Sequence, residues 1–266
     1  MCYSIVSLLA LVLMLSAAPA FPSYGGNMDI EIISDNGGVS SRIPHKNYST
    51  GGTQIIKSYL EARKGENYSI LIRNNTPDRV GVVIAVDGRN IITGKKSFLN
   101  NSEMMYIVAP YNTAKLEGWR TDQNTVHRFY FTDVKDSYSV KTFGDSSAMG
   151  VIAVSAFREK ERPELLYDRK PLKDNAPAPS AGAQAKESAK RYESDAAGTG
   201  FGDEKFAPVT KVEFEPESVP FKKMLVKYEW RETLCRKGLL KCYSEKRNRL
   251  WDEAEFAPYP PGYGYR

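Results

Sequence analysis

Hydrophobic and polar residues alternate with a period of two along much of residues 53–157, which is the pattern of strands with one buried face. Residues 80–86 are apolar at nearly every position, as in a strand that is buried on both faces. Asp87 and Gly88 follow as a tight-turn signal, and Ile91 and Ile92 continue on the far side as a hairpin partner. Further short strands are expected at 54–62, 68–73, 104–109, 113–119, 125–132 and 149–157.

These short strands are separated by Gly, Asn, Asp and Pro, and no helical stripe of useful length interrupts them. Close spacing of this kind is typical of all-β domains. The sequence therefore predicts a mainly β fold, an antiparallel β-sandwich or jelly-roll-like domain over residues 53–158, with an incomplete barrel as the alternative.

The flanking segments differ in composition. Residues 21–52 are rich in Gly, Ser and Asn and predict a flexible lead-in, in which 30–33 form a short strand at a sheet edge. Residues 159–206 carry charges and an Ala-Pro-rich stretch, which predicts a disordered, low-complexity linker. The glycines of 198–202 are expected in a flexible turn, because the Lys and Ser/Thr of a phosphate-binding loop do not follow them.

Order is expected to return in residues 207–250. Alternation near 210–215 and again near 224–228 predicts a β-hairpin. A short helix follows over 230–237 and ends at Gly238. Residues 251–266 form a Pro/Tyr/Gly tail with extended or polyproline-like character.

The first twenty residues have the pattern of a secretory signal peptide. An apolar run over 5–15 is followed by Ala18-Pro19-Ala20, a small-residue cleavage site. The run is too short to cross a membrane as a helix. We therefore expect an exported protein, located in the periplasm, at the cell surface or outside the cell.

Net charge and cysteine content bear on the protein's partners and on the compartment where it is located. The formal net charge is +5, an excess too small to indicate nucleic acid as a partner. Residues 222–249 are locally basic and could contact anionic lipid peripherally, although a solvated surface is the ordinary explanation. Cys235 and Cys242 remain after cleavage and are expected to form a disulfide in an oxidising compartment, with two reduced thiols as the alternative.

Residues with catalytic or metal-binding chemistry are few. His45 lies in the lead-in, and His127 lies mid-strand beside Phe129 and Phe131, where a core or interface role is more common than that of a base. Glu213, Glu215 and Glu217 share one face of an expected strand, but lysines opposite them explain them more simply than a cation. We expect no catalytic residues, no metal and no cofactor.

Two polar clusters are candidates for ligand binding. Trp119 and Arg120 at a strand end could form a stacking and hydrogen-bonding platform for a sugar or a peptide. Asp87, Arg89 and Asn90 form a second cluster in the predicted hairpin turn. The alternative is structural: Trp119 packs over the end of the sandwich and Arg120 pairs with an aspartate.

The motifs at 86–90, 118–120, 129–132, 137–138 and 150–154, with 198–202 and 228–234 further on, resemble a group of uncharacterised exported bacterial proteins. In that group a β-rich domain precedes a low-complexity stretch. The similarity spans most of residues 55–240. It implies a periplasmic or secreted bacterial setting and carries no activity.

Together these observations predict an exported, non-enzymatic protein of the cell envelope that binds a protein partner or assembles at the envelope, with an envelope protein or a surface polysaccharide as the partner. The first alternative is a carbohydrate-binding module that uses Trp119 and neighbouring aromatics. An envelope enzyme of unrecognised type is a third possibility. The ligand and the oligomeric state are left open by the sequence.

Overall fold

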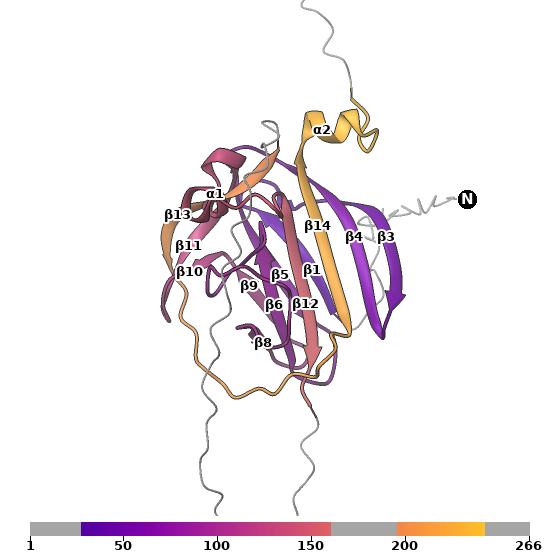
Figure 1. The fold of residues 1–266 in the computed structure, drawn as a ribbon, viewed down its shortest axis with the longest axis vertical. Helices are drawn as coiled ribbons and strands as arrows, with labels where there is room; N and C mark the ends of the chain where they lie inside the picture. Colours follow the sequence, from indigo (N-terminus) through magenta and orange to yellow (C-terminus); the bar gives the residue numbers. More distant parts are fainter. Residues whose placement is uncertain (1–27, 161–195, 243–266) are drawn as a thin grey trace, which may run out of the picture.

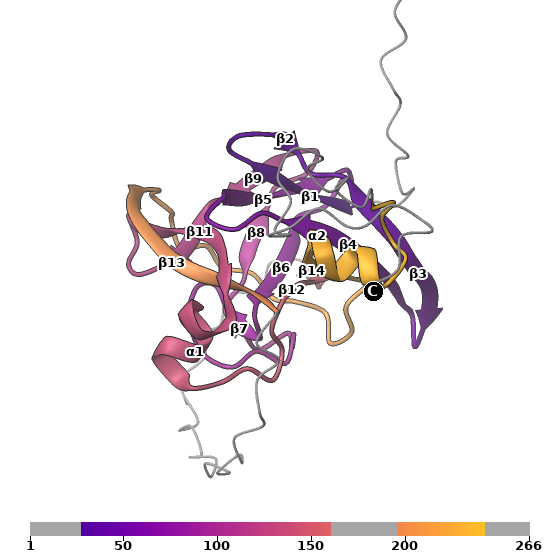
Figure 2. The same cartoon turned by 90° about the horizontal axis from the view of Figure 1, so that it is seen from above.

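The computed structural model describes residues 28–160 and 196–242 of the protein. Over these residues the chain forms two β-sheets that pack face to face around one hydrophobic core (Figure 2). The predicted fold class, a mainly β protein of sandwich type, is confirmed. The strands are short, and most of their connections are tight turns or brief loops.

The first sheet is antiparallel. Its main path runs β10 (Gly118–Arg120), β11 (Thr125–Asp133), β5 (Asn67–Asn74), β1 (Met28–Ser34) and β2 (Gly38–Val39). Strand β13 (Ala197–Phe206) pairs with β11, and β9 (Thr113–Leu116) pairs with β5. Strands β5 and β11 pair only where Asn67 and Tyr68 meet Tyr130 and Phe129, and further along β5 pairs with β9 and β11 with β10.

The second sheet is mixed. Its order is β3 (Arg42–Thr50), β4 (Thr53–Ala62), β14 (Lys222–Trp230), β12 (Val151–Arg158), β6 (Val80–Val86) and β7 (Arg89–Asn90), with β8 (Tyr106–Val108) also against β6 (Figure 1). Strands β4 and β14 are parallel, and the other neighbours are antiparallel. Three short helices complete the described chain: η1 (Val134–Asp136), α1 (Tyr138–Phe143) and α2 (Arg231–Arg236).

Strand β6 is buried at all seven positions, as its sequence predicts. One face contributes Val82, Ile84 and Val86 to the core between the sheets. The other face is covered by residues from loops. A Cβ built on Gly81 would lie 2.5 Å from the sulfur of Met105 and from the ring of Phe214. The strand therefore needs apolar residues on both sides.

The expected flexible lead-in is wrong for residues 28–50, which form β1, β2 and β3. Met28, Ile30 and Ile32 are fully buried, whereas Asp29 and Glu31 are only partly buried, so a strand period is present in this stretch. The short strand expected over 30–33 is confirmed. It lies next to the sheet edge, because only the two-residue β2 pairs beyond it.

The predicted C-terminal hairpin is wrong, although the strand and the short helix at its end are present. Strand β14 pairs in parallel with β4 and antiparallel with β12. Residues 210–215 form no strand. Alternating residues Met224, Val226 and Tyr228 fit the core between the sheets, and this burial selects distant partner strands over a local hairpin.

Residues 197–206, expected in the linker, form β13. The signal peptide over 1–20, linker residues 161–195, basic residues 243–249 and the tail over 251–266 lie outside the described residues. Among the helices of the described part, none has the length and apolar character needed to cross a membrane.

Candidate binding sites

Asp87 and Gly88 make the turn between β6 and β7. Both have positive φ values, 49° and 76°, which is the conformation of a two-residue hairpin turn. Strand β7 pairs back onto β6 through Arg89 and Asn90. The turn signal in the sequence is therefore confirmed, and it fixes where the Asp87 side chain points.

That side chain is buried and accepts three hydrogen bonds. The backbone N–H of Gly150 and the hydroxyl of Tyr228 donate to Oδ1 at 2.8 and 2.5 Å, and the N–H of Thr199 donates to Oδ2 at 2.7 Å. Burial raises the pKa of Asp87 from 3.8 to about 6, although the three donors act in the opposite direction. The carboxyl group thus joins the turn to β13, to β14 and to the start of β12.

The hydrogen bonds continue through the core to the first sheet. The Oγ1 of Thr199 lies 2.7 Å from the Tyr228 hydroxyl and 2.8 Å from the Tyr68 hydroxyl. Burial raises the pKa of both tyrosines well above its usual range, so both hydroxyls keep their protons. Asp87, Thr199, Tyr228 and Tyr68, here called the Asp87 network, link the two sheets by polar contacts.

The polar groups of Arg89 and Asn90 also bind partners inside the protein. The guanidinium of Arg89 pairs with Asp145 at 2.6 Å and lies 4.1 Å from the centre of the Phe143 ring. The amide of Asn90 donates to the carbonyl of Met104 at 2.9 Å. Both residues are less than a tenth exposed, so their polar groups support loops.

Trp119 and Arg120 lie beside this turn region, because the N–H of Arg120 donates to the carbonyl of Ile91 at 2.8 Å. Trp119 is 2% exposed, and its indole N–H donates to the carbonyl of Gly200 at 2.9 Å. Arg120 Nε donates to the Tyr106 hydroxyl at 2.8 Å. The fold therefore brings the two predicted clusters to one region, but their polar side chains already bind other groups of the protein. Ligand binding by these five residues stays a prediction that this geometry does not favour.

The glycines of 198–202 serve close packing within β13. A Cβ on Gly200 would lie 2.1 Å from the Tyr130 ring, so only glycine allows the ring to lie flat across the strand. On the other side Phe201 stacks on His127 with ring centres 4.1 Å apart. The His127 ring thus contacts an aromatic side chain and also the backbone, because its Nδ1 lies 2.9 Å from the carbonyl oxygen of Gly202. The flexible turn expected here is replaced by a strand.

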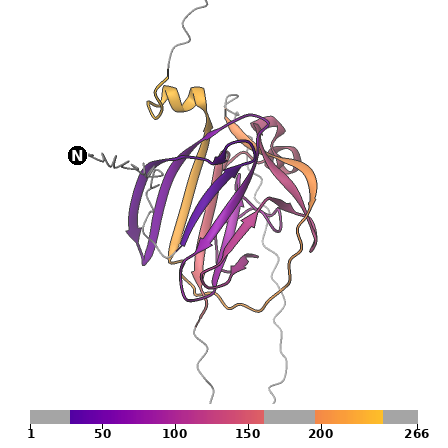
Figure 3. The ribbon, with the colours of Figure 1, turned by 180° about the vertical axis from the view of Figure 1, so that it is seen from behind.

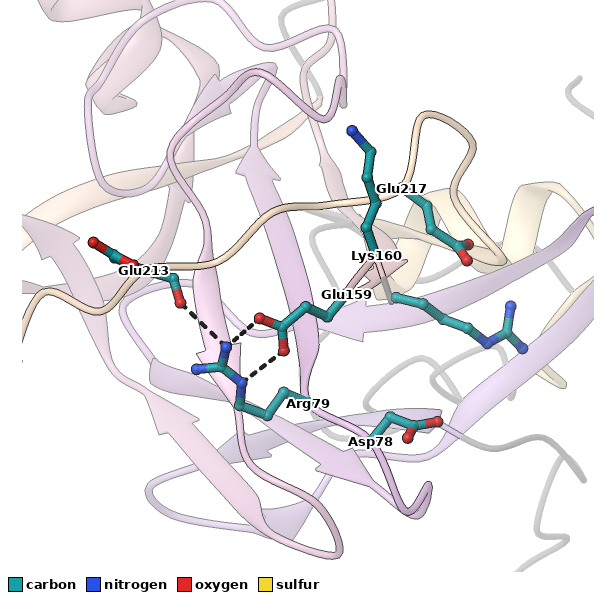
Figure 4. A pocket seen from close by; sticks show the side chains of 7 residues that line it. Asp78, Arg79, Glu159, Lys160, Glu213 and Glu217 are labelled. Carbon is teal, nitrogen blue, oxygen red and sulfur yellow. Dashed lines mark hydrogen bonds and ion pairs between the residues drawn. The ribbon is translucent and has the colours of Figure 1, made fainter. Parts of the chain in front are cut away.

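Residues 207–221 pass from β13 to β14 across the end of the second sheet (Figure 1). An open cleft lies beside them (Figure 4). We call residues 207–221 the strap and this depression the strap cleft. Its volume is about 970 Å³. Every described residue that lines it carries a charged side chain: Asp78, Arg79, Arg158, Glu159, Lys160, Glu213 and Glu217.

The walls of the strap cleft are fixed by backbone and ionic contacts. Glu217 N–H donates to the Arg158 carbonyl at 2.9 Å, and Lys160 N–H donates to the Glu215 carbonyl at 2.8 Å. The Arg79 guanidinium binds both carboxylate oxygens of Glu159 and also the Glu213 carbonyl, as Figure 4 shows. The cleft therefore has a defined shape and charges of both signs.

A second depression, of about 640 Å³, lies where β4 and β14 end and α2 begins. Ala62 and the partly buried Trp230 contribute its apolar surface, and we call it the Trp230 groove. Ion pairs between Arg231 and Glu61, at 3.0 Å, and between Lys64 and Asp133, at 2.5 Å, stand among its charged residues. The remaining lining residues are Arg63, Glu232, Thr233 and Arg236.

Other sequence candidates have clear positions. Cys235 and Cys242 are joined as a disulfide with a Cα–Cα distance of 5.7 Å. The described residues contain no group of three His, Cys, Asp or Glu side chains suited to a metal ion. Within the basic segment, Lys222 is buried and its Nζ donates to the Met28 carbonyl at 2.5 Å, so it is not part of a basic surface.

Sequence reasoning missed the residues that surround Asp87. Gly150, Thr199 and Tyr228 are separated from it by 63, 112 and 141 positions. No spacing rule connects such distant residues. The strap cleft was missed for the same reason, because its described lining residues come from three separate segments of the chain. Comparisons of the chain with protein-family models, with curated proteins and with solved structures returned no match.

Proposed function

We propose that this protein is an exported, non-enzymatic binding protein of the cell envelope, and that the strap cleft receives a charged segment of a partner protein. The observation that carries this proposal is the lining of the cleft, which is charged at all seven positions that the structure describes. Small-molecule sites are mostly apolar and enclose their ligand. An open surface with charges of both signs instead matches the polar parts of protein interfaces, where charge complementarity selects the partner.

The charges that remain available in the cleft support the same proposal. The ion pair between Arg79 and Glu159 fixes both side chains and leaves neither charge unpaired. Asp78 is exposed and Glu217 is partly buried on the opposite wall, and neither forms an ion pair within the described residues. Arg158 is exposed and stacks over Phe221 at 4.5 Å. A partner with basic residues near Asp78 and Glu217 would be complementary to these groups.

The proposal can be tested by site-specific photocrosslinking in the native envelope. A crosslinking amino acid at Ser218, which is exposed on the strap, is expected to capture one defined protein, identified by mass spectrometry. The same amino acid at Val39, 47% exposed on β2, is the matched control. The double variant Asp78→Lys/Glu217→Lys should reduce the yield at Ser218, whereas Glu204→Lys on β13 should not. Capture at both sites alike, or at neither, would contradict the proposal.

A second candidate function is carbohydrate binding, with Trp230 in place of Trp119. The Trp230 groove combines an aromatic side chain with carboxylates and guanidinium groups, which is the combination that sugars use for stacking and hydrogen bonding. Glycan-array binding that is lost in Trp230→Ala and retained in Trp119→Phe would favour it. Binding retained in both variants would reject both tryptophans as the sugar platform.

A further inference from the structure

Strand β3 differs from every other long strand in its exposure. Seven of its nine residues, from Pro44 to Thr50, are exposed, and the first two are only partly buried. Within the described residues β3 pairs with β4 alone and forms one rim of the second sheet (Figures 1 and 3). Its outer edge therefore presents backbone N–H and C=O groups to solvent.

The first part of this edge carries two features that hinder unintended pairing with strands of other molecules. Pro44 lacks an N–H, and a bulge interrupts the register between Pro44 and Lys46. From Lys46 to Thr50 the pairing with β4 is regular again, up to the turn at Gly51 and Gly52. The regular stretch is long enough for a short added strand and begins at a lysine.

The outer face of the sheet beside this edge carries both basic and apolar side chains in each row across the strands. The register puts Tyr48 next to Ile55, which neighbours Lys223. The next row contains Lys46 and Lys57, followed by Leu225. Lys46, Lys57 and Lys223 form no ion pair within the described part of the chain. An acidic side chain on a strand added at this edge would lie beside Lys46, with Lys57 one strand and Lys223 two strands further in, and would gain a favourable interaction without displacing an existing one.

We propose that the edge of β3 from Lys46 to Thr50 binds an extended acidic segment of a partner protein, which adds to the second sheet as a further strand. Main-chain hydrogen bonds to β3 supply the affinity, as in other cases of strand addition. An acidic residue beside Lys46 and an apolar residue beside Tyr48, two positions apart on one face, supply the specificity. A second copy of this chain is a poorer occupant, because pairing of two β3 strands would bring both sets of lysines onto one surface.

This site is independent of the strap cleft. The described residues that line the strap cleft come from 78–79, 158–160 and 213–217, and none of them belongs to β3 or to its neighbour β4. The double variant Asp78→Lys/Glu217→Lys should leave strand addition at β3 unchanged. Failure of one proposal therefore leaves the other standing.

The test uses the exported chain with its disulfide and a fluorescently labelled synthetic peptide of alternating Thr, Val and Glu. A peptide with Lys in place of Glu is the control probe. Anisotropy is expected to show saturable binding of the Glu peptide and roughly tenfold weaker binding to Lys46→Glu/Lys57→Glu. Lys95→Glu, an exposed lysine beyond the opposite rim of the sheet, should bind as the unaltered protein does. Equal binding of the two peptides would overturn the proposal.

Backbone pairing is tested separately from charge. Successive N–H groups of a strand point in opposite directions, so two peptides N-methylated on alternate residues should behave differently. One pattern should abolish binding and the other should be tolerated. Tolerance of both patterns would overturn strand addition. Tighter binding to phosphatidylglycerol vesicles than to the Glu peptide, lost in Lys46→Glu/Lys57→Glu, would also overturn it and identify a membrane-facing surface.

Discussion

The hydroxyl of Tyr228 lies 2.5 Å from Oδ1 of Asp87 in the interior of the protein, although 141 positions separate the two residues. Tyr228 belongs to β14, and Asp87 forms the turn after β6. These strands are not neighbours, because β12 lies between them. The contact therefore bridges the end of β12, and the N–H of Gly150 at that end joins the same carboxyl group.

The first prediction concerns Asp87→Asn. An asparagine keeps one acceptor oxygen but turns an amide NH₂ towards either the Thr199 N–H or the donors on Oδ1. A buried donor is then left without a partner, and the free energy of unfolding should fall by about 1–3 kcal/mol at pH 7. Urea denaturation measures this loss. Asp203→Asn, an exposed aspartate on β13, is the control and should change stability by less than about 0.5 kcal/mol. An equal loss in both variants would show that the Asp87 network contributes nothing specific.

The second prediction is a pH dependence of stability. Burial raises the pKa of Asp87 in the folded state to about 6, above its ordinary value of 3.8. The folded protein therefore binds this proton more tightly than the unfolded chain, and the resulting stabilisation is complete below about pH 4. It is lost as the pH rises through about 6, and the total change is about 2–3 kcal/mol.

Other carboxyl groups act in the opposite direction. Ion pairs and hydrogen bonds lower the pKa of Asp35, Glu117 and Asp145, and their contribution is lost at acidic pH. The contribution of Asp87 is thus best read from the difference between the protein and its Asp87→Asn variant, which should widen from pH 7 to pH 4.5. Carbon-detected NMR of the Asp87 carboxyl group offers a direct check. A titration midpoint near 4 would refute the prediction.

Local patterns were enough to predict parts of this fold. Residues 80–86 are apolar throughout and form the buried β6, and Asp87-Gly88 forms the expected turn. Pairing between distant strands could not be read in the same way. The parallel contact of β14 with β4 joins segments more than 160 positions apart, whereas a hairpin is the nearest alternative that a local pattern can suggest.

The candidate site shows the same limit. Asp87, Arg89, Asn90, Trp119 and Arg120 were selected because polar and aromatic residues in turns often bind ligands. The same residue types also serve when a buried turn must satisfy its polar groups, and burial is a tertiary property. Sequence identified the region where the two sheets are joined, but the exposure that separates the two roles became visible only in the fold.

The third prediction tests the packing of Tyr130 on Gly200. Gly200→Ala would place a methyl group within 2.1 Å of the present ring position, so the ring must move. We expect a loss of about 1–2 kcal/mol in the free energy of unfolding. In the Tyr130→Ala background the same substitution should cost much less, and this coupling is measured by a double-mutant cycle. Gly37→Ala, where the nearest atom is 3.7 Å away, is the control. Additive losses would rule out the proposed contact.

The fourth prediction concerns the disulfide between Cys235 and Cys242. Helix α2 is anchored to the body of the protein through Leu234, which is fully buried, and the chain then turns at Gly238, where φ is 69°. The bond closes a loop of seven positions, so its removal in Cys235→Ser/Cys242→Ser should cost up to about 2 kcal/mol. Because the loop includes only the end of α2, the loss should be local. Hydrogen exchange should increase at the amides of α2 and remain unchanged in β6.

Reduction of the unaltered protein provides the matched control, since it should reproduce the exchange pattern of the double serine variant. Alkylation and intact-mass measurement of the protein isolated under oxidising conditions should find Cys235 and Cys242 protected from the reagent. Two labelled cysteines would contradict the bond. Faster exchange in β6 as well, after loss of a bond that does form, would show that helix α2 stabilises the whole sandwich. The connection would run through β14, because α2 follows its last residue and Tyr228 of the Asp87 network lies near the same end.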